Sequence, residues 1–297
     1  MNKSKLLKTT VAIVALAALV TGGYVYKDAI QSRIARTAAV VSGQEIKPLL
    51  NSEGRYIRQI VAQDNSTSRT IMWQSDSSEA DAVIEYRLAG SENTQSIGAT
   101  DKVFTDDGST TYIHEATLTG LTPKTKYEYR VGYGSDRRSD WYSLETAGAS
   151  VYDVLIYPDS QSGDYSQWEE IVKDSAHRNP RTALYISLGD LVDNGEQDYQ
   201  WRTWLNSIRP LSANVPLATT LGNHEMYTLD WKMREPYAYL NYFAVPPNGN
   251  EIFNRRYYSY DFGDVHYVVL DTMLYESNHE DNHDTHPVSY THLEPTR

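Results

Sequence analysis

The sequence contains no cysteine among its 297 residues. Disulfide bonds, thiol chemistry and a lipid-modified cysteine anchor are therefore excluded. Positive charge is also scarce, because 27 lysines and arginines stand against 39 aspartates and glutamates and give a formal net charge of −12. This acidic balance argues against the binding of extended nucleic acid, but it is compatible with a small phosphorylated substrate held by metal ions.

An apolar run of full membrane-spanning length is not evident either. Three lysines within the first eight residues precede an apolar run over residues 10–20, and this order predicts a secretory signal. The run is short for a membrane span unless it extends through residues 24–26, and no convincing small-x-small cleavage site follows it. We therefore expect residues 1–30 to be a signal peptide or a membrane anchor on an exported, extracellular or cell-surface protein that touches a membrane only through this segment. Residues 31–52 would then be a linker.

Residues 53–147 are dominated by short β-rich runs, which clusters of serine, asparagine, aspartate and glycine separate. The runs are residues 70–74, 82–87, 111–118 and 126–131. Their spacing and turn chemistry predict an all-β sandwich that ends near residues 147–150.

Within this region, residues 118–132 resemble the fibronectin type III pattern, in which a tyrosine at the start of a strand bonds back to the preceding corner. By this resemblance Tyr127 is the corner tyrosine and Trp73 is the core tryptophan of an earlier strand. His114 lies inside a predicted strand, so we interpret it as a packed or surface histidine and not as a metal ligand.

In the second half, three apolar runs each end abruptly in a cluster of possible metal ligands. The runs and their clusters are residues 154–157 before Asp159-Ser160-Gln161, residues 184–188 before Gly189-Asp190-Leu191-Val192-Asp193-Asn194, and residues 217–221 before Gly222-Asn223-His224-Glu225. Short apolar runs bounded by glycine and proline predict buried parallel strands.

Two segments with helical spacing lie between these runs. The first, Ser166–Asn179, places apolar residues 168, 171 and 172 on one face, and the second, Gln197–Leu211, does so with residues 201, 204, 205 and 208. Two right-handed strand–helix–strand crossovers bring the ends of all three strands to one edge of the sheet. We therefore expect Asp159, Asp190 and Asn223 to converge. Farther along, residues 256–260 and 265–270 predict a hairpin that joins the sheet.

Carboxylate, amide and imidazole groups at one edge of a sheet form a site that suits manganese, iron or zinc better than soft metals. Two such ions about 3.5–4 Å apart, with a shared carboxylate, would serve in-line displacement at phosphorus. Asp190 lies on the middle strand end and is the candidate bridge. His224 lies beside Asn223 and is placed to donate to a phosphate oxygen or to the leaving group.

The three clusters, in this order at strand ends, resemble the first three motifs of the calcineurin-like metallophosphoesterases. The resemblance implies a metallophosphoesterase domain of the layered αββα type over residues 151–276. It also implies a dinuclear site in which Asp159 binds the first of two divalent or trivalent ions, Asp190 bridges, Asn223 binds the second and His224 contacts the phosphate. A hydroxide between the ions would attack phosphorus. Behind these residues we expect Asp193, Asn194 and Glu225 in supporting positions.

A fibronectin-like sandwich ahead of such a domain is the arrangement of the purple acid phosphatases. This resemblance implies an acid phosphatase-like phosphomonoesterase or phosphodiesterase with a phosphorylated small-molecule or nucleotide substrate. The alternative is a non-catalytic exported protein that binds a surface through its sandwich and carries a degenerate phosphoesterase domain.

The sequence departs from these families in three places. Asp193 stands where purple acid phosphatases carry the tyrosine that ligates ferric iron, so we expect a colourless site. Gln161 stands where the wider group usually has a histidine, so we expect only a weak ligand there. The later histidine motifs are not recognisable after Thr272. Residues 277–297 show no periodicity and predict an unstructured or artefactual tail on a truncated domain, although His279, His283 and His286 are further possible nitrogen ligands.

Overall fold

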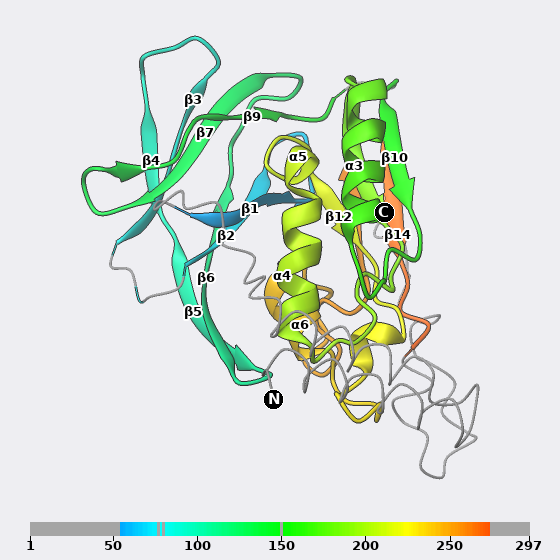
Figure 1. Cartoon of the computed structure of the whole chain (residues 1–297). Helices are drawn as coiled ribbons and strands as arrows, with labels where there is room; N and C mark the ends of the chain where they lie inside the picture. The colour runs from blue at the N-terminus through cyan, green and yellow to red at the C-terminus, as the bar shows by residue number, and fades with distance from the viewer. Residues whose placement is uncertain (1–53, 76–77, 79–80, 149–150, 274–297) are drawn as a thin grey trace, which may run out of the picture.

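The computed structural model shows a β-sandwich joined to an α/β half (Figure 1). It describes residues 54–75, 78, 81–148 and 151–273. Residues 1–30, the linker at 31–52, and the tail at 277–297, which includes His279, His283 and His286, lie outside this description. Among the described residues, none of the helices has both the length and the apolar character needed to span a membrane.

The sandwich consists of two antiparallel sheets, as predicted. One contains β1 (Arg55–Ile60), β2 (Arg69–Ser75), β6 (Ser109–Leu118) and β5 (Thr100–Asp106) in that order. The other contains β4 (Gln95–Gly98), β3 (Ala82–Leu88), β7 (Lys126–Tyr133) and β8 (Arg137–Arg138), and β9 (Tyr142–Glu145) also pairs with β7. The four predicted β-rich runs form parts of β2, β3, β6 and β7.

The expected corner and core residues of the sandwich take their predicted places. The Tyr127 hydroxyl accepts a hydrogen bond from the backbone N–H of Thr122 at 3.0 Å, and Trp73 is fully buried between the sheets. His114 stacks on Trp73 with ring centroids 5.2 Å apart and hydrogen-bonds to Ser75 and Asp101. It is therefore a packed histidine.

The α/β half contains the predicted parallel strands and helices. In chain order its elements are β10 (Asp153–Tyr157), α3 (Ser166–Arg178), β11 (Thr182–Ser187), α4 (Asp198–Ser207), α5 (Arg209–Ser212) and β12 (Leu217–Thr219). β10 pairs in parallel with β11, and β11 pairs in parallel with β12. Their carboxyl ends therefore meet at one edge of the sheet, as the crossovers predicted.

Three local expectations for this half were wrong. The second helix is not continuous, because Pro210 has no N–H to donate and its ring excludes the preceding turn, so α4 ends and α5 begins there. Ile171 is 53% exposed, since α3 buries the side of the helix that carries Trp168 and Val172. Ile156 is 55% exposed because β10 is an edge strand.

The last described elements follow β12. They are the short helix η1 (His224–Met226), α6 (Tyr237–Tyr242), β13 (Tyr258–Phe262) and β14 (Val265–Val269). β13 and β14 form the predicted hairpin, but it is a separate two-stranded sheet and does not join the main one. Arg256 is buried and pairs with Asp271 and Glu235.

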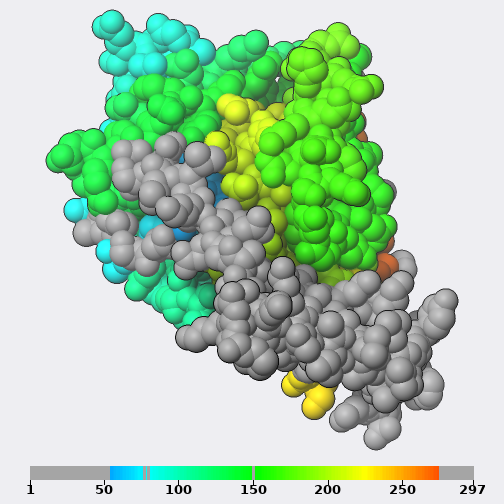
Figure 2. All heavy atoms as spheres, viewed as in Figure 1, coloured from blue at the N-terminus to red at the C-terminus, as the bar shows by residue number. Residues whose placement is uncertain are grey.

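The two halves share one sheet, which the sequence did not indicate. β1 of the sandwich pairs in parallel with β12 at Ile60 and Leu217, so that a seven-stranded sheet runs from β10 through β1 to β5. Gln59 Nε2 and the Tyr129 hydroxyl both donate to the carbonyl of Ala213, at 2.9 and 2.7 Å. In Figures 1 and 2 the segment around α5 fills the space between the sandwich and α3. The strand that precedes Asn223 and His224 is thereby set directly against the sandwich.

Candidate metal centre

Asp190 is the meeting point of the three strand ends. The backbone carbonyl of Asp190 accepts a hydrogen bond from the backbone N–H of Gln161 at 2.9 Å. The side-chain Oδ1 of Asp190 accepts another from the backbone N–H of His224 at 3.0 Å. A Cβ on Gly222 would lie only 2.1 Å from Asp190 Oδ1. Only glycine therefore allows the loop after β12 to approach this carboxylate so closely.

Two of the predicted ligands lie on strained backbone. Asp159 and Asp190 have φ values of 40° and 47°, in the left-handed region that residues other than glycine seldom adopt. Each costs on the order of 1 kcal/mol, and such strain gathers at functional sites where the surroundings hold it in place. Asp159 is exposed, beyond the end of β10.

The buried carboxylate of Glu225 organises the loop that carries Asp190. Its Oε2 accepts hydrogen bonds from the backbone N–H groups of Asp190 at 3.0 Å and Gly222 at 2.8 Å. Its Oε1 accepts from Leu191 at 2.7 Å and Val192 at 3.3 Å. Burial and the nearby Asp190 carboxylate raise the pKa of Glu225 to about 7, while the amide donors act in the opposite direction. Glu225 thus supports the candidate ligands from behind, without pointing its own oxygens to solvent.

His224 is oriented by the backbone. Its Nδ1 lies 2.7 Å from the carbonyl oxygen of Asp193, and a carbonyl can only accept, so Nδ1 carries the hydrogen. The Asp193 carboxylate lies 3.7 Å from the same nitrogen. Nε2, on the opposite side of the ring, is therefore available for a substrate.

The donor atoms left over at the strand ends fit a cation that prefers oxygen. Gln161 Oε1 is buried and has no hydrogen-bond partner among the described residues, which is costly unless a cation or another donor meets it. Asn223 donates its Nδ2 to the hydroxyl of Tyr227 at 3.3 Å, and this leaves its Oδ1 as the outward acceptor. These amide oxygens and the carboxylates of Asp159 and Asp190 are the oxygen donors that the three strand ends offer, and oxygen donors suit hard cations.

The donor set has limits within the described part of the chain. There, no group of three or more histidines, aspartates and glutamates lies close enough to hold an ion. The amide oxygens of Gln161 and Asn223 are consequently needed alongside the two carboxylates. Residues 279, 283 and 286, the other predicted nitrogen donors, lie outside the described ranges.

Asn194 supports the loops, and Asp193 is itself held in its turn while its carbonyl orients His224. Asn194 Oδ1 accepts from the backbone N–H of Glu196 at 3.1 Å, and its Nδ2 donates to the carbonyl of Thr228 at 2.6 Å. Asp193 receives its support through its backbone N–H, which donates to Gln200 Oε1 at 2.6 Å. Asn194 therefore joins the turn after β11 to the segment that follows η1.

Three residues near His224 were not singled out from the sequence. Tyr227 and Trp231 pack their rings against the imidazole, with centroids 5.5 and 6.0 Å away. Gln200, on α4, holds the turn that contains Asp193. The sequence does not single out the aromatic pair, because the chain contains 24 tyrosines and 6 tryptophans.

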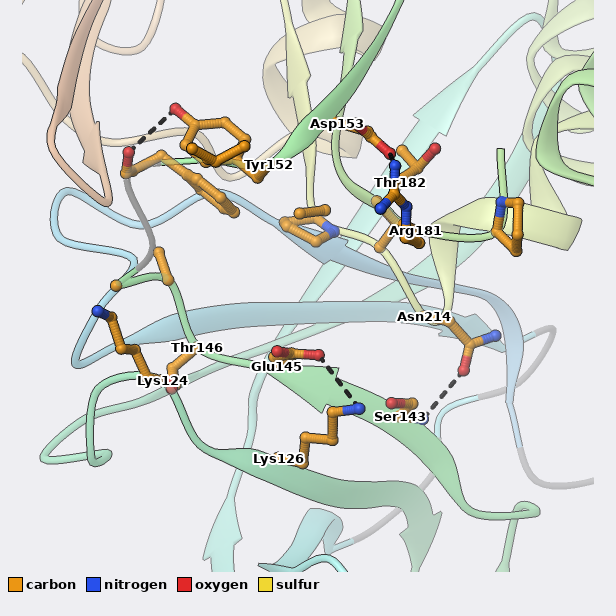
Figure 3. A pocket seen from close by; sticks show the side chains of 18 residues that line it. Lys124, Lys126, Ser143, Glu145, Thr146, Tyr152, Asp153, Arg181, Thr182 and Asn214 are labelled. Atoms are coloured by element: carbon orange, nitrogen blue, oxygen red, sulfur yellow. Dashed lines mark hydrogen bonds and ion pairs between the residues drawn. The ribbon is translucent and has the colours of Figure 1, made fainter. Parts of the chain in front are cut away.

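A cavity of roughly 600 Å³ lies elsewhere, between the sandwich and the α/β half. Figure 3 shows Lys126 paired with Glu145 on one wall and Arg181 paired with Asp153 on the other. Asp153 begins β10, so this cavity lies at the amino ends of the parallel strands, whereas Asp190 follows the carboxyl end of β11. The cavity therefore does not belong to the candidate metal centre.

Comparison with known families agrees with this geometry. The model of the purple acid phosphatase N-terminal domain matches residues 56–146, and the model of the calcineurin-like phosphoesterases matches residues 139–294, more than half of the chain. The chain belongs to the calcineurin-like phosphoesterase family. The chain is 27% identical over 206 residues to purple acid phosphatase 23 of Arabidopsis thaliana, an alignment that covers 57% of the chain and 43% of that protein.

Two further proteins are similar to this chain. It is 26% identical to acid phosphatase type 7 of Homo sapiens over 58% of the chain and 37% of that protein. A purple acid phosphatase from yellow lupin (Lupinus luteus) seeds shares the fold with a TM-score of 0.62 at 20% identity, over 73% of the chain and 44% of that structure. The chain thus spans about two fifths of the length of these relatives.

Proposed function

We propose that this chain is a metal-dependent phosphoester hydrolase, acting as an acid phosphatase-like monoesterase or diesterase on small phosphorylated molecules or nucleotides. The single observation that carries the proposal is the arrangement around Asp190. There the loops after three parallel strands meet through two hydrogen bonds at 2.9 and 3.0 Å. Similarity to acid phosphatases of plants and animals supports the same chemistry.

Two metal ions would be held by the oxygen donors at these strand ends. Asp159 and the weak ligand Gln161 would bind one ion, Asn223 would bind the other, and Asp190 would be shared. Such ions supply charge stabilisation at the phosphate oxygens and lower the pKa of bound water. The buried, unpaired Oε1 of Gln161 supports its part in this set.

His224 is the proposed contact to the substrate. Its Nδ1–H is committed to the carbonyl of Asp193, so its Nε2 faces away and would meet a phosphate or leaving-group oxygen. When protonated, this nitrogen would donate to the negative charge that develops there. The hydrogen bond to Asp193 fixes the ring for this purpose, and no rearrangement is required.

The location of the protein remains a proposal from its sequence. The basic start and the apolar run in residues 1–30 support export, with an extracellular or cell-surface location. The sandwich, with its corner tyrosine bonded at 3.0 Å, supports a fibronectin type III-like domain in such a protein. The alternative of a non-catalytic surface-binding protein would keep the same sandwich and lose only turnover.

The test compares Asp190→Asn and His224→Ala in the full chain. Asp190→Asn removes a ligand charge and should reduce the bound manganese, measured per chain after purification without chelator. His224→Ala should retain the metal and lower the hydrolysis of p-nitrophenyl phosphate by about 10²–10⁴-fold. Asp174→Asn, an exposed aspartate on α3, is the control and should behave as the parent. Near-normal turnover of either site variant would refute the proposal, and metal binding without turnover in the parent would favour the non-catalytic alternative.

A further inference from the structure

The segment after η1, residues 226–234, folds back on itself next to the candidate metal centre. Tyr227 and Met233 form an isolated antiparallel bridge. The backbone N–H of Arg234 donates to the carbonyl of Met226 at 2.8 Å and closes the base of the loop. The loop is therefore closed by its own backbone hydrogen bonding.

Two aromatic rings of this loop surround His224. The Tyr227 ring meets the imidazole at an interplanar angle of 83°, and the Trp231 ring meets it at 90°. The centroids of Tyr227 and Trp231 lie 5.3 Å apart. Both residues are partly exposed, so neither is sealed in the core. We name this pair, Tyr227 and Trp231, the aromatic wall.

Trp231 has two energetically unfavourable features in the aromatic wall. Its φ is 61°, which is unfavourable for so bulky a side chain. Its indole Nε1 is buried without a hydrogen-bond partner in the described part of the chain. Two unfavourable features on one residue beside a substrate-facing histidine point to a function, because folding stability alone would not retain them.

The rest of the molecule braces the aromatic wall from two sides. On the α/β side, Glu196 Oε2 accepts from the backbone N–H of Leu229 at 2.7 Å, and Asn194 holds the carbonyl of Thr228. On the sandwich side, the β5–β6 hairpin reaches down beside α4 and α6 (Figure 1), where Asp106 binds the guanidinium of Arg234 through both oxygens. A wall fixed in this way loses little conformational entropy when a ligand packs on it.

We propose that the aromatic wall binds the leaving group of the phosphoester and selects substrates whose leaving group is itself aromatic. The inference rests on the proposed function, since it places the phosphate at Nε2 of His224. Groups bonded to that phosphate are then within reach of rings whose centroids lie 5.5 and 6.0 Å from the imidazole. A planar ring gains offset or edge-to-face contacts with Tyr227 and Trp231, whereas a small alkyl group gains few of them.

The experiment uses two probes that cannot be hydrolysed, phenylphosphonate and methylphosphonate, with the full chain in the presence of manganese. Calorimetry gives the two dissociation constants, and their ratio isolates the contribution of the ring. We expect phenylphosphonate to bind about five- to ten-fold more tightly than methylphosphonate. Phenylphosphonate should also shift the indole N–H resonance of Trp231, assigned by its loss in Trp231→Phe, more than methylphosphonate does.

Three variants test whether Trp231 causes the preference for phenylphosphonate over methylphosphonate. Trp231→Leu keeps an apolar side chain and should bring the two dissociation constants to within about two-fold of each other. Trp231→Phe keeps a ring and should preserve most of the preference. Trp141→Leu, which removes a tryptophan from between Arg87 and Arg130 on the sandwich, should leave the ratio unchanged.

The outcomes distinguish failure of the aromatic subsite from failure of the phosphate site itself. Equal affinity for the two probes in the parent, or a preference that survives Trp231→Leu, would overturn the aromatic subsite and leave the proposed function standing. Failure of both probes to bind would refute the phosphate site itself, and the subsite with it. A preference for phenylphosphonate that Trp231→Leu abolishes and Trp141→Leu retains would establish the subsite.

Discussion

Glu225 Oε2 accepts the backbone N–H of Asp190 at 3.0 Å, so the residue proposed to bridge two metal ions is held in place by a buried carboxylate 35 positions later in the chain. Glu225 also accepts three further amide hydrogens from the loops after β11 and β12. The two loops are therefore joined through one side chain. This explains how a strained aspartate can keep its conformation.

Glu225→Gln should break this junction. A glutamine offers one acceptor oxygen and turns an NH₂ group toward two of the four amide donors, which leaves them unsatisfied in the interior. We expect a loss of about 2–4 kcal/mol in the free energy of unfolding, measured with urea, and weaker manganese binding. Glu169→Gln, on the outer side of α3, is the matched control and should cost less than about 0.5 kcal/mol. An unchanged free energy of unfolding in Glu225→Gln would show that the four hydrogen bonds do not contribute to stability.

Gly222→Ala should disturb the site directly. The added Cβ would lie 2.1 Å from Asp190 Oδ1 and 2.5 Å from Asp190 N, so either the carboxylate or the loop has to move. We expect manganese affinity to fall by about ten-fold or more, because a displaced ligand loses its geometry. Gly98→Ala provides the control, since nothing lies within 4 Å of its added Cβ. Equal manganese affinity in the two variants would contradict the close approach seen here.

The pair Arg234–Asp106 should contribute measurably to stability, because it is partly buried. The two side chains are 19% and 13% exposed and make a two-point contact between the sandwich and the loop of the aromatic wall. In a double-mutant cycle with Arg234→Met and Asp106→Asn, we expect a coupling energy of about 1–2 kcal/mol.

The comparison pair for that cycle is Arg178–Asp174 on α3, whose side chains are 73% and 57% exposed. Its coupling should stay at or below about 0.5 kcal/mol because solvent screens it. A coupling for Arg234–Asp106 no larger than this value would mean that the sandwich does not brace the loop.

Tyr129→Phe tests the contact between the two halves. The variant removes the hydroxyl that donates to Ala213 at 2.7 Å and leaves a buried carbonyl with one partner fewer. We expect the free energy of unfolding to fall by about 1–2 kcal/mol. Tyr86→Phe, which loses an exposed hydroxyl contact with Gln95 in the same sandwich, should stay within about 0.5 kcal/mol of the parent. A reversed order of the two losses would contradict a structural role for the Ala213 contact.

The sequence predicted the parts of the fold that depend on local pattern. The apolar runs before Asp159, Asp190 and Asn223 form the parallel strands, and the crossovers bring Asp190 to the backbone of His224 in the loop after β12. The Tyr127 corner likewise follows from a short local motif. These features are readable because period, turn residues and chirality act within a few dozen residues.

Features that depend on distant partners could not be predicted in this way. Arg256 is buried, and its partners Asp271 and Glu235 lie 15 and 21 positions away in the chain. The pairing of β1 with β12 joins segments that lie about 150 residues apart, and no local sequence pattern indicates that these two strands pair. The aromatic wall was missed for another reason. Tyrosines and tryptophans are common in this chain, and only the fold distinguishes those beside His224.

The continuous seven-stranded sheet determines how the protein unfolds. Although the chain consists of a sandwich and an α/β half, β1 and β12 lie side by side inside one hydrogen-bonded array. Neither half can open without exposing an unpaired strand edge of the other, so heating should produce one cooperative transition and not two. For the same reason, a protease cut near residue 148 would sever the backbone while the two fragments stayed associated. The boundary that is evident along the chain is therefore not a boundary in the folded molecule.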